Sequence, residues 1–346
     1  MVTALDQTVV LTSRGTDART AGIEDLRDVF RPSKLAFQKH KHFPSAASNR
    51  TRISKAETST SARCARDTND PFVYNNTRKF QCECHDLYEE LVPYVEAWRW
   101  QKETVDRIST SVARGEEPPN CVILLQHPPV YTMGTRSSDA HLRFDKNHPP
   151  FELHKTERGG EVTYHGPGQL VMYPILNLRH QKTDLHWYLR TLEEVVIRAL
   201  WSSCRLRASR IDGLTGVWIG DEKVAAMGVR VSRWITYHGL ALNVTNDLAP
   251  FENIVPCGIT DRRVGNIKQL LRQRHPLATW GNDISPVGML QDDYELLEDA
   301  TLLDRVHQSL LSEFAELFQM ELVAPVNKGP QCIRHVHYDL EEKLRA

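Results

Sequence analysis

Two residues in the second half of the chain have the types and surroundings that nucleophilic catalysis requires. Cys257 lies between Pro256 and Gly258 in IVPCGIT, where the proline restricts the backbone and the glycine leaves space beside the sulfur. Reactive cysteines occupy accessible, positively charged surroundings, whereas most others are small buried apolar side chains. Cys257 is therefore the candidate nucleophile, and a purely structural Pro-Cys-Gly turn is the alternative.

Lys223 is the candidate partner of this thiol. It begins the stretch KVAAMGVRV, in which Ala225, Ala226 and Gly228 would let a ligand or another backbone approach closely. A lysine at a hairpin turn is usually only solvated. Beside a thiol, however, an ammonium group stabilises the thiolate and can carry a proton. We expect Lys223 to work as a pair with Cys257 if the fold brings the two together.

A third stretch, RGGEVTYHGPGQ from Arg158 to Gln169, interrupts strand-like sequence with glycines and a proline. A plain strand gains nothing from these residues, because glycine costs conformational entropy and proline cannot donate to a ladder. We infer that the backbone itself must come close to something here. His165 would form a hydrogen-bonding wall of the site, and a dyad of Cys257 with His165 is the alternative to the cysteine–lysine pair.

The surrounding sequence predicts strands and amphipathic helices that could position these residues. The expected strands are residues 121–126, 162–165, 170–178 and 235–245, together with a hairpin over 216–234 that turns at Gly220-Asp221. The expected helices are residues 92–108, 185–200 with Asp184 as N-cap, 263–271 and 296–318, with an irregular segment over 247–259 and a loop over 270–293. Hairpins interspersed with helices predict an α+β or mixed α/β sheet flanked by helices.

Composition argues against several classes of function. The 346 residues carry a formal net charge of -1, so no excess positive charge is available to hold a nucleic acid. No run of eighteen apolar residues occurs, so we expect no membrane span. The seven cysteines are odd in number and irregularly spaced, which is typical of reduced thiols. Cys82-x-Cys84-His85 and Cys332-x2-His335-x-His337 lack a second ligand pair at zinc-finger spacing, so we expect no metal.

Residues 1–75 differ from the rest of the chain. Between residues 31 and 66 there are nine Lys and Arg against one acid, Glu57, and few apolar residues. Such a segment cannot offset its ordering entropy, so we expect it to be disordered. A basic, Ser-rich leader resembles an organelle transit peptide. Acidic residues among the first thirty fit this less well, and a dispensable tail is the alternative.

Four stretches, in this order, resemble the signature segments of the lipoyl(octanoyl) transferases: RGGEVTYHGPGQL, GVWIGDEKVAAMGVR, TYHGLALNV and FENIVPCGI. The similarity covers about residues 79–318 and includes QHPPVYTMG. It implies a fold like that of the biotin and lipoate protein ligases. The catalytic domain would be residues 79–320, and residues 321–346 would form a C-terminal tail.

The resemblance also implies a reaction and its residues. An octanoyl group would pass from octanoyl-acyl carrier protein to a lysine of a lipoyl domain, in a 2-oxoacid dehydrogenase E2 subunit or the glycine cleavage H protein. Cys257 would be the acyl-thioester nucleophile and Lys223 its acid/base partner, with no cofactor. The residues that match the family's substrate-lining segments are Arg158, Gly159, Gly160, Glu161, Val162, Thr163, Tyr164, His165, Ala226, Met227, Gly228, Gly239, Leu240 and Ala241. Val162, Leu170 and Met227 would shape a tunnel for the acyl chain.

The same resemblance leaves two alternative functions to consider and suggests the organelle in which the protein is located. An ATP-dependent lipoate-protein ligase on this fold would need no cysteine, and a non-catalytic docking protein would lack the Cys or the Lys. Because carrier and lipoyl domains are typically acidic, a basic patch should dock them. Its candidates, each of which could also be an ordinary solvated arginine, are Arg136, Arg158, Arg230, Arg233, Arg262 and Arg263. The sequences of the motifs look more similar to the plastid type of plant octanoyltransferase than to the mitochondrial type, so we expect a plastid location, with the mitochondrion as the alternative.

Overall fold

The computed structural model describes residues 79–258, 262–273 and 298–325. The expected disordered leader (1–75), most of the expected loop over 270–293 and nearly all of the expected tail after residue 320 lie outside the described residues. None of the helices within the described ranges is both long enough and apolar enough to cross a membrane.

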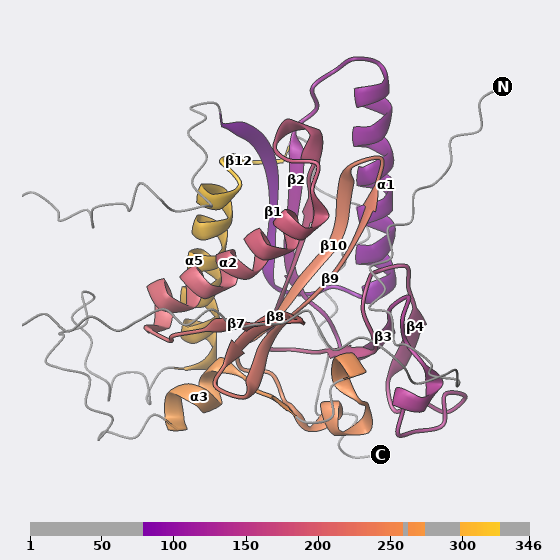
Figure 1. The fold of residues 1–346 in the computed structure, drawn as a ribbon, viewed down its shortest axis with the longest axis vertical. Helices are drawn as coiled ribbons and strands as arrows, with labels where there is room; N and C mark the ends of the chain where they lie inside the picture. Colours follow the sequence, from indigo (N-terminus) through magenta and orange to yellow (C-terminus); the bar gives the residue numbers. More distant parts are fainter. Residues whose placement is uncertain (1–78, 259–261, 274–297, 326–346) are drawn as a thin grey trace, which may run out of the picture. The chain divides into compact units, whose positions relative to one another are not determined.

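A nine-stranded mixed sheet is the centre of the described part of the chain (Figure 1). Eight strands lie side by side in the order β12-β1-β2-β6-β10-β9-β8-β7, and β11 pairs with β9. Strand β1 is parallel to both β12 and β2, whereas the pairs from β2 to β7 are antiparallel. The strands are β1 (Phe80–Leu91), β2 (Asn120–Gln126), β6 (Gln169–Ile175), β7 (Ser209–Ile211), β8 (Leu214–Ile219), β9 (Glu222–Ser232), β10 (Ile235–Asn243), β11 (Arg263–Val264) and β12 (Met320–Val323).

Helices cover both faces of this sheet, which confirms the predicted fold class (Figure 1). Helix α1 (Tyr94–Ala113) packs on one face, and α2 (Leu185–Cys204) and α5 (Asp299–Leu317) pack on the other; the shorter α3 is Ile267–Gln273. Alternate side chains of β2 enter the cores on the two faces: Val122 and Leu124 belong to the α2–α5 core, while Ile123 and Leu125 belong to the α1 core. A strand buried on both faces reads as a continuous apolar run.

All four predicted helices are present, and the hairpin β8–β9 and the strands β2, β6 and β10 are confirmed. The helix predicted over 263–271 begins only at Ile267, because Arg263–Val264 form β11, which pairs with β9. The side chain of Asp184 accepts a hydrogen bond from the Trp187 backbone at 3.0 Å, as expected of an N-cap. Strand β1 was not predicted, because FQCECHDLYEEL lacks a clean apolar alternation. Strand β12 extends the sheet to Val323, so residues 321–323, which the sequence assigns to the tail, pair with β1.

A second sheet of three strands lies in the same part of the chain, in the order β4-β3-β5. Its strands are β4 (Glu152–Lys155), β3 (Val130–Met133) and β5 (Thr163–His165), and short 3-10 helices are η1 (Asp139–His141), η2 (Leu178–His180), η3 (Ala249–Asn253) and η4 (Pro256–Gly258). The segment Gly166-Pro167-Gly168 carries the chain from β5 in this sheet to β6 in the large one. Gly168 has φ +85°, and a Cβ there would lie 2.6 Å from the Asn246 nitrogen, so glycine is required.

Candidate active site

Cys257 lies in η4 with its backbone in an unusual conformation. Its φ is +58° and its ψ 15°, in the left-handed region that non-glycine residues rarely adopt. Its backbone nitrogen donates to the Val162 oxygen at 3.2 Å, and the Val255 nitrogen donates to the His141 oxygen at 2.8 Å. These bonds tie the segment to residues that flank the small sheet. Cys257 is partly exposed, whereas Cys82, Cys121 and Cys204 are buried.

Lys223 reaches this thiol from the large sheet. Its Nζ donates to the Cys257 Sγ at 3.1 Å, although the two residues are 34 positions apart in the chain. Lys223 is only 7% exposed, and its Nζ lies 5.4 Å from the centre of the Trp218 ring. The β8–β9 pairing shifts by one residue next to Lys223, where Val224 is the extra residue of a bulge, and such bulges redirect side chains. A partly exposed thiol in contact with a sheltered ammonium is suited to nucleophilic chemistry.

A pocket opens beside this pair. Its lining residues are Thr163, Gln169, Lys223, Ala226, Ala241, Asn243, Phe251, Pro256, Cys257 and Val264. Ala226 and Ala241 are cross-strand partners on β9 and β10, so two small side chains leave the space. Sequence reasoning did not single out Asn243, Phe251 or Val264. Asn243 ends β10 directly after the small and apolar run GLAL, and this polar residue was the one local signal available.

The glycines of the Arg158 segment allow backbone to pack on backbone. The Gly159 nitrogen donates to the Val229 oxygen at 3.0 Å, and a Cβ at Gly228 would lie 2.9 Å from the Gly159 oxygen. A Cβ at Gly134 would overlap the Gly160 oxygen at 2.3 Å. The glycines are needed here because, without side chains, the segment can lie between β9 and the residues that follow β3.

Arg158 is buried and bonded to the protein itself. Its Nη2 donates to the Thr132 and Glu161 backbone oxygens at 2.7 and 2.8 Å, and its Nη1 donates to the Gly159 oxygen at 3.0 Å. Burial lowers the pKa of this guanidinium. Arg158 therefore braces the glycine segment and offers no surface charge for docking, which corrects its place among the basic-patch candidates. Two other candidates, Arg262 and Arg263, pair with Asp221 and Glu222.

The remaining sequence-predicted substrate residues lie outside the pocket lining. Glu161 binds His141 at 3.1 Å, while Val162 and Tyr164 lie in the core beneath the small sheet. Leu240 and Leu170 belong to the α2–α5 core, and Met227 packs against it. A Cβ at Gly239 would overlap the Met172 oxygen at 2.0 Å, so this glycine allows β10 to pair closely with β6.

Comparison with known proteins identifies the family. Residues 93–284 match the lipoyl protein ligase A/B catalytic domain. The chain is 54% identical over 248 residues to the chloroplastic octanoyltransferase LIP2p2 of Arabidopsis thaliana, covering 72% of this chain and 82% of that one. The chain belongs to the octanoyltransferase family. An octanoyltransferase of Synechococcus sp. (strain WH7803) is 56% identical over 176 residues, 51% of this chain and 71% of that protein. A solved lipoate protein ligase of Thermoplasma acidophilum superposes with a TM-score of 0.47 at 18% identity, covering 71% and 87% of the two chains.

In this octanoyltransferase, His165 has both ring nitrogens engaged away from the thiol. Gln169 donates through Nε2 to Tyr164 and Asn243, so its Oε1 accepts from His165 Nδ1 at 2.7 Å. The Nε2 of His165 lies 3.3 Å from the Thr132 hydroxyl. Burial lowers the pKa of His165 to about 3, so the ring is neutral at physiological pH. This geometry favours the hydrogen-bonding wall over a Cys257–His165 dyad.

Acid should destabilise the octanoyltransferase well above the pH at which carboxylates protonate. Burial lowers the pKa of His127 to about 4 and the pKa values of His165 and His238 to about 3. The unfolded chain binds protons at these rings below a pH of about 6.5, whereas the folded chain does not. As the pH falls from about 6.5 to the pKa of a ring in the folded protein, that ring should lower the free energy of unfolding by about 1.4 kcal/mol per pH unit.

Urea unfolding at pH 7.5 and 5.5 measures this effect. His165→Gln should flatten the dependence, while His148→Gln, at a side chain that is 86% exposed, should leave it unchanged. A free energy of unfolding that is equal at the two pH values would show that these rings are protonated in the folded protein.

Proposed function

We propose that this octanoyltransferase moves the octanoyl group from octanoyl-acyl carrier protein to a lysine of lipoyl domains through a thioester on Cys257, with Lys223 as acid/base partner. The observation that carries the proposal is the 3.1 Å contact between Lys223 Nζ and Cys257 Sγ at the edge of a pocket. Octanoyl transfer is the activity of the family to which the chain belongs.

The first half of the reaction loads the enzyme. The Cys257 thiolate attacks the carbonyl carbon of the carrier thioester, forming a new carbon–sulfur bond as the bond to the pantetheine sulfur breaks. The Lys223 ammonium gives a proton to the departing pantetheine sulfur and becomes an amine. Because one thioester replaces another, little bond energy is lost.

The second half transfers the acyl group. The amine of the incoming lysine attacks the octanoyl-Cys257 carbonyl, forming an amide as the bond to the Cys257 sulfur breaks. The Lys223 amine takes the proton that the attacking nitrogen loses, which restores the ammonium–thiolate pair. The small side chains of Ala226 and Ala241 and the ring of Phe251 would line the path of the acyl chain. No metal or nucleotide enters either step.

Partners and location extend the proposal. The acceptors would be lipoyl domains of 2-oxoacid dehydrogenase E2 subunits or the glycine cleavage H protein. The chloroplastic relative and the basic, Ser-rich leader both support a plastid location, with residues 1–75 as a transit peptide. The catalytic domain, expected from the sequence at residues 79–320, would extend to Val323, because β12 pairs with β1.

A transfer assay without nucleotide tests the proposal against the ligase alternative. The chain is mixed with octanoyl-acyl carrier protein and a lipoyl domain, and in parallel with free octanoate, ATP and the same domain. We expect an octanoylated lipoyl domain, seen by intact mass, only in the first mixture. Modification that requires ATP and free octanoate would establish a ligase instead, and modification in neither mixture would leave a docking protein.

A further inference from the structure

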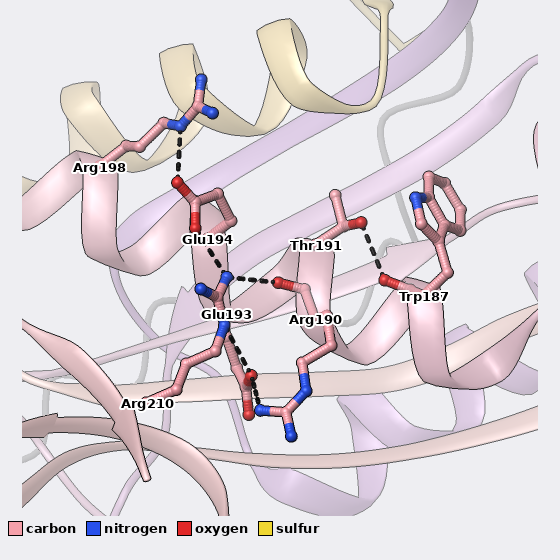
Figure 2. Close-up of polar contacts among 7 residues, drawn as sticks. All are labelled: Trp187, Arg190, Thr191, Glu193, Glu194, Arg198 and Arg210. Atoms are coloured by element: carbon pink, nitrogen blue, oxygen red, sulfur yellow. Dashed lines mark hydrogen bonds and ion pairs between the residues drawn. The ribbon is translucent and has the colours of Figure 1, made fainter. Parts of the chain in front are cut away.

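A cluster of charged side chains joins helix α2 to Arg210 of strand β7 (Figure 2). Glu193 is 1% exposed, and its Oε2 accepts from Arg190 Nη1 at 2.8 Å and from Arg210 Nε at 3.1 Å. Arg210, on β7, also binds Glu194 at 2.7 Å, and Glu194 binds Arg198 at 2.9 Å. Because burying a carboxylate is costly unless it is paired and hydrogen-bonded, the two arginines make the position of Glu193 tolerable.

The second oxygen of Glu193 connects this cluster to the active site. Its Oε1 accepts the backbone N–H of Gly216 on β8 at 2.9 Å, in a buried hydrogen bond. Gly216 has φ +132°, and a Cβ there would lie 2.5 Å from Lys223 Cε and 3.2 Å from Lys223 Nζ. The side chain of Lys223 therefore lies directly against the α-carbon of Gly216. Contacts run without a gap from Glu193 through Gly216 and Lys223 to the Cys257 sulfur.

We propose that Glu193 is a positioning residue for acyl transfer, which holds the Gly216 backbone and thereby sets the place of the Lys223 ammonium against the Cys257 sulfur. The inference rests on the proposed roles of Lys223 and Cys257. A displacement of about 1 Å in a catalytic group can reduce a rate by about a hundredfold. Lys223 is long and flexible, so its head group keeps one position only if its stem is supported.

The competing explanation is that Glu193 forms ion pairs that only stabilise the fold. Two substitutions of Glu193 distinguish this explanation from a positioning role. Glu193→Asp keeps the negative charge but withdraws the carboxylate by one methylene. The long side chains of the two arginines can follow it, whereas the Gly216 N–H belongs to the backbone of β8 and cannot. Glu193→Gln loses the charge but keeps an oxygen that can accept the Gly216 N–H. A positioning role predicts that Asp is the damaging change, whereas an ion-pair role predicts that Gln is. Glu194→Asp is the matched control, because it shortens a carboxylate that shares Arg210.

The first measurement is the single-turnover rate at which octanoyl-acyl carrier protein loads Cys257, over a range of donor concentrations. The second is the rate at which iodoacetamide alkylates Cys257, followed by the mass of the peptide that contains it. For Glu193→Asp we expect the maximal loading rate and the alkylation rate to fall by about 10- to 100-fold. The donor concentration that gives half-maximal loading should be unchanged. For Glu193→Gln and Glu194→Asp we expect both rates to stay within about threefold of the unsubstituted chain. Unfolding temperatures are recorded for all variants.

Some results would overturn the proposal. If Glu193→Gln is slower than Glu193→Asp, or if Glu194→Asp slows alkylation as much as Glu193→Asp, Glu193 only stabilises the fold. If the unsubstituted chain is not loaded at Cys257, the proposed function fails, but the alkylation rates still decide the role of Glu193. Alkylation does not need the acyl donor, so the two failures are distinguishable.

Discussion

Cys257→Ala should abolish octanoyl loading, lowering its rate by at least about a thousandfold. The reason is chemical: the substitution removes the sulfur that forms the thioester, while the pocket walls and Lys223 stay in place. Intact mass after incubation with octanoyl-acyl carrier protein reports the adduct. A lipoyl domain added afterwards should remain unmodified by the substituted enzyme.

Cys84→Ala is the matched control for this prediction. Cys84 is also partly buried, but burial raises the pKa of its thiol to about 12, so it stays protonated and unreactive at neutral pH. We expect the Cys84 variant to be loaded normally. An octanoyl adduct of equal size on the Cys257→Ala protein would place the acyl group elsewhere and would refute the proposed intermediate.

Lys223→Met should lower the rates of loading and transfer by about 10²- to 10⁴-fold, the range usual for loss of a general acid or base. The methionine keeps most of the stem that packs on Gly216 but removes the ammonium that contacts the thiol. Quenched-flow measurement of each half-reaction gives the two rates. Lys182→Met serves as control, since Lys182 pairs with Asp184 before helix α2.

Lys223→Arg separates the two roles assigned to this lysine. A guanidinium keeps the positive charge beside the thiol but does not give up its proton at any working pH. We therefore expect both half-reactions to be slowed, because loading needs this side chain to give a proton and transfer needs it as a free base. Rates close to those of the unsubstituted enzyme in both half-reactions would mean that charge alone matters, and normal transfer alone would remove Lys223 as the base of that step.

The site forms where segments of different origin meet. Cys257 is held by bonds to residues flanking the small sheet, whereas Lys223 projects from β9 of the large sheet. The Gly166-Pro167-Gly168 link joins β5 to β6, and both strands contribute a pocket residue, Thr163 and Gln169. The relative position of the two sheets therefore sets the distance between nucleophile and proton carrier.

Local sequence was sufficient for much of the fold. The 3.6-residue apolar periods of α1, α2 and α5, and the apolar runs of β2 and β6, follow from neighbours that act within a few residues. The motifs RGGEVTYHGPGQL and FENIVPCGI likewise made Cys257 and the glycine segment visible. Strand β1 was not visible, because its stability comes from pairing with β2 and β12, which are distant in the chain.

Only the tertiary structure decided which residues act together. The apolar stripe of α2 places Glu193 nearer to the buried face than Glu194, but it does not show which partner either acid meets. Burial gives one of them the Gly216 N–H and leaves the other with Arg198 and Arg210. The same holds for Arg158, a plausible surface charge that the fold buries as a brace. The sequence by itself determined the chemistry available to this octanoyltransferase, and long-range packing determined which groups are close enough to perform it.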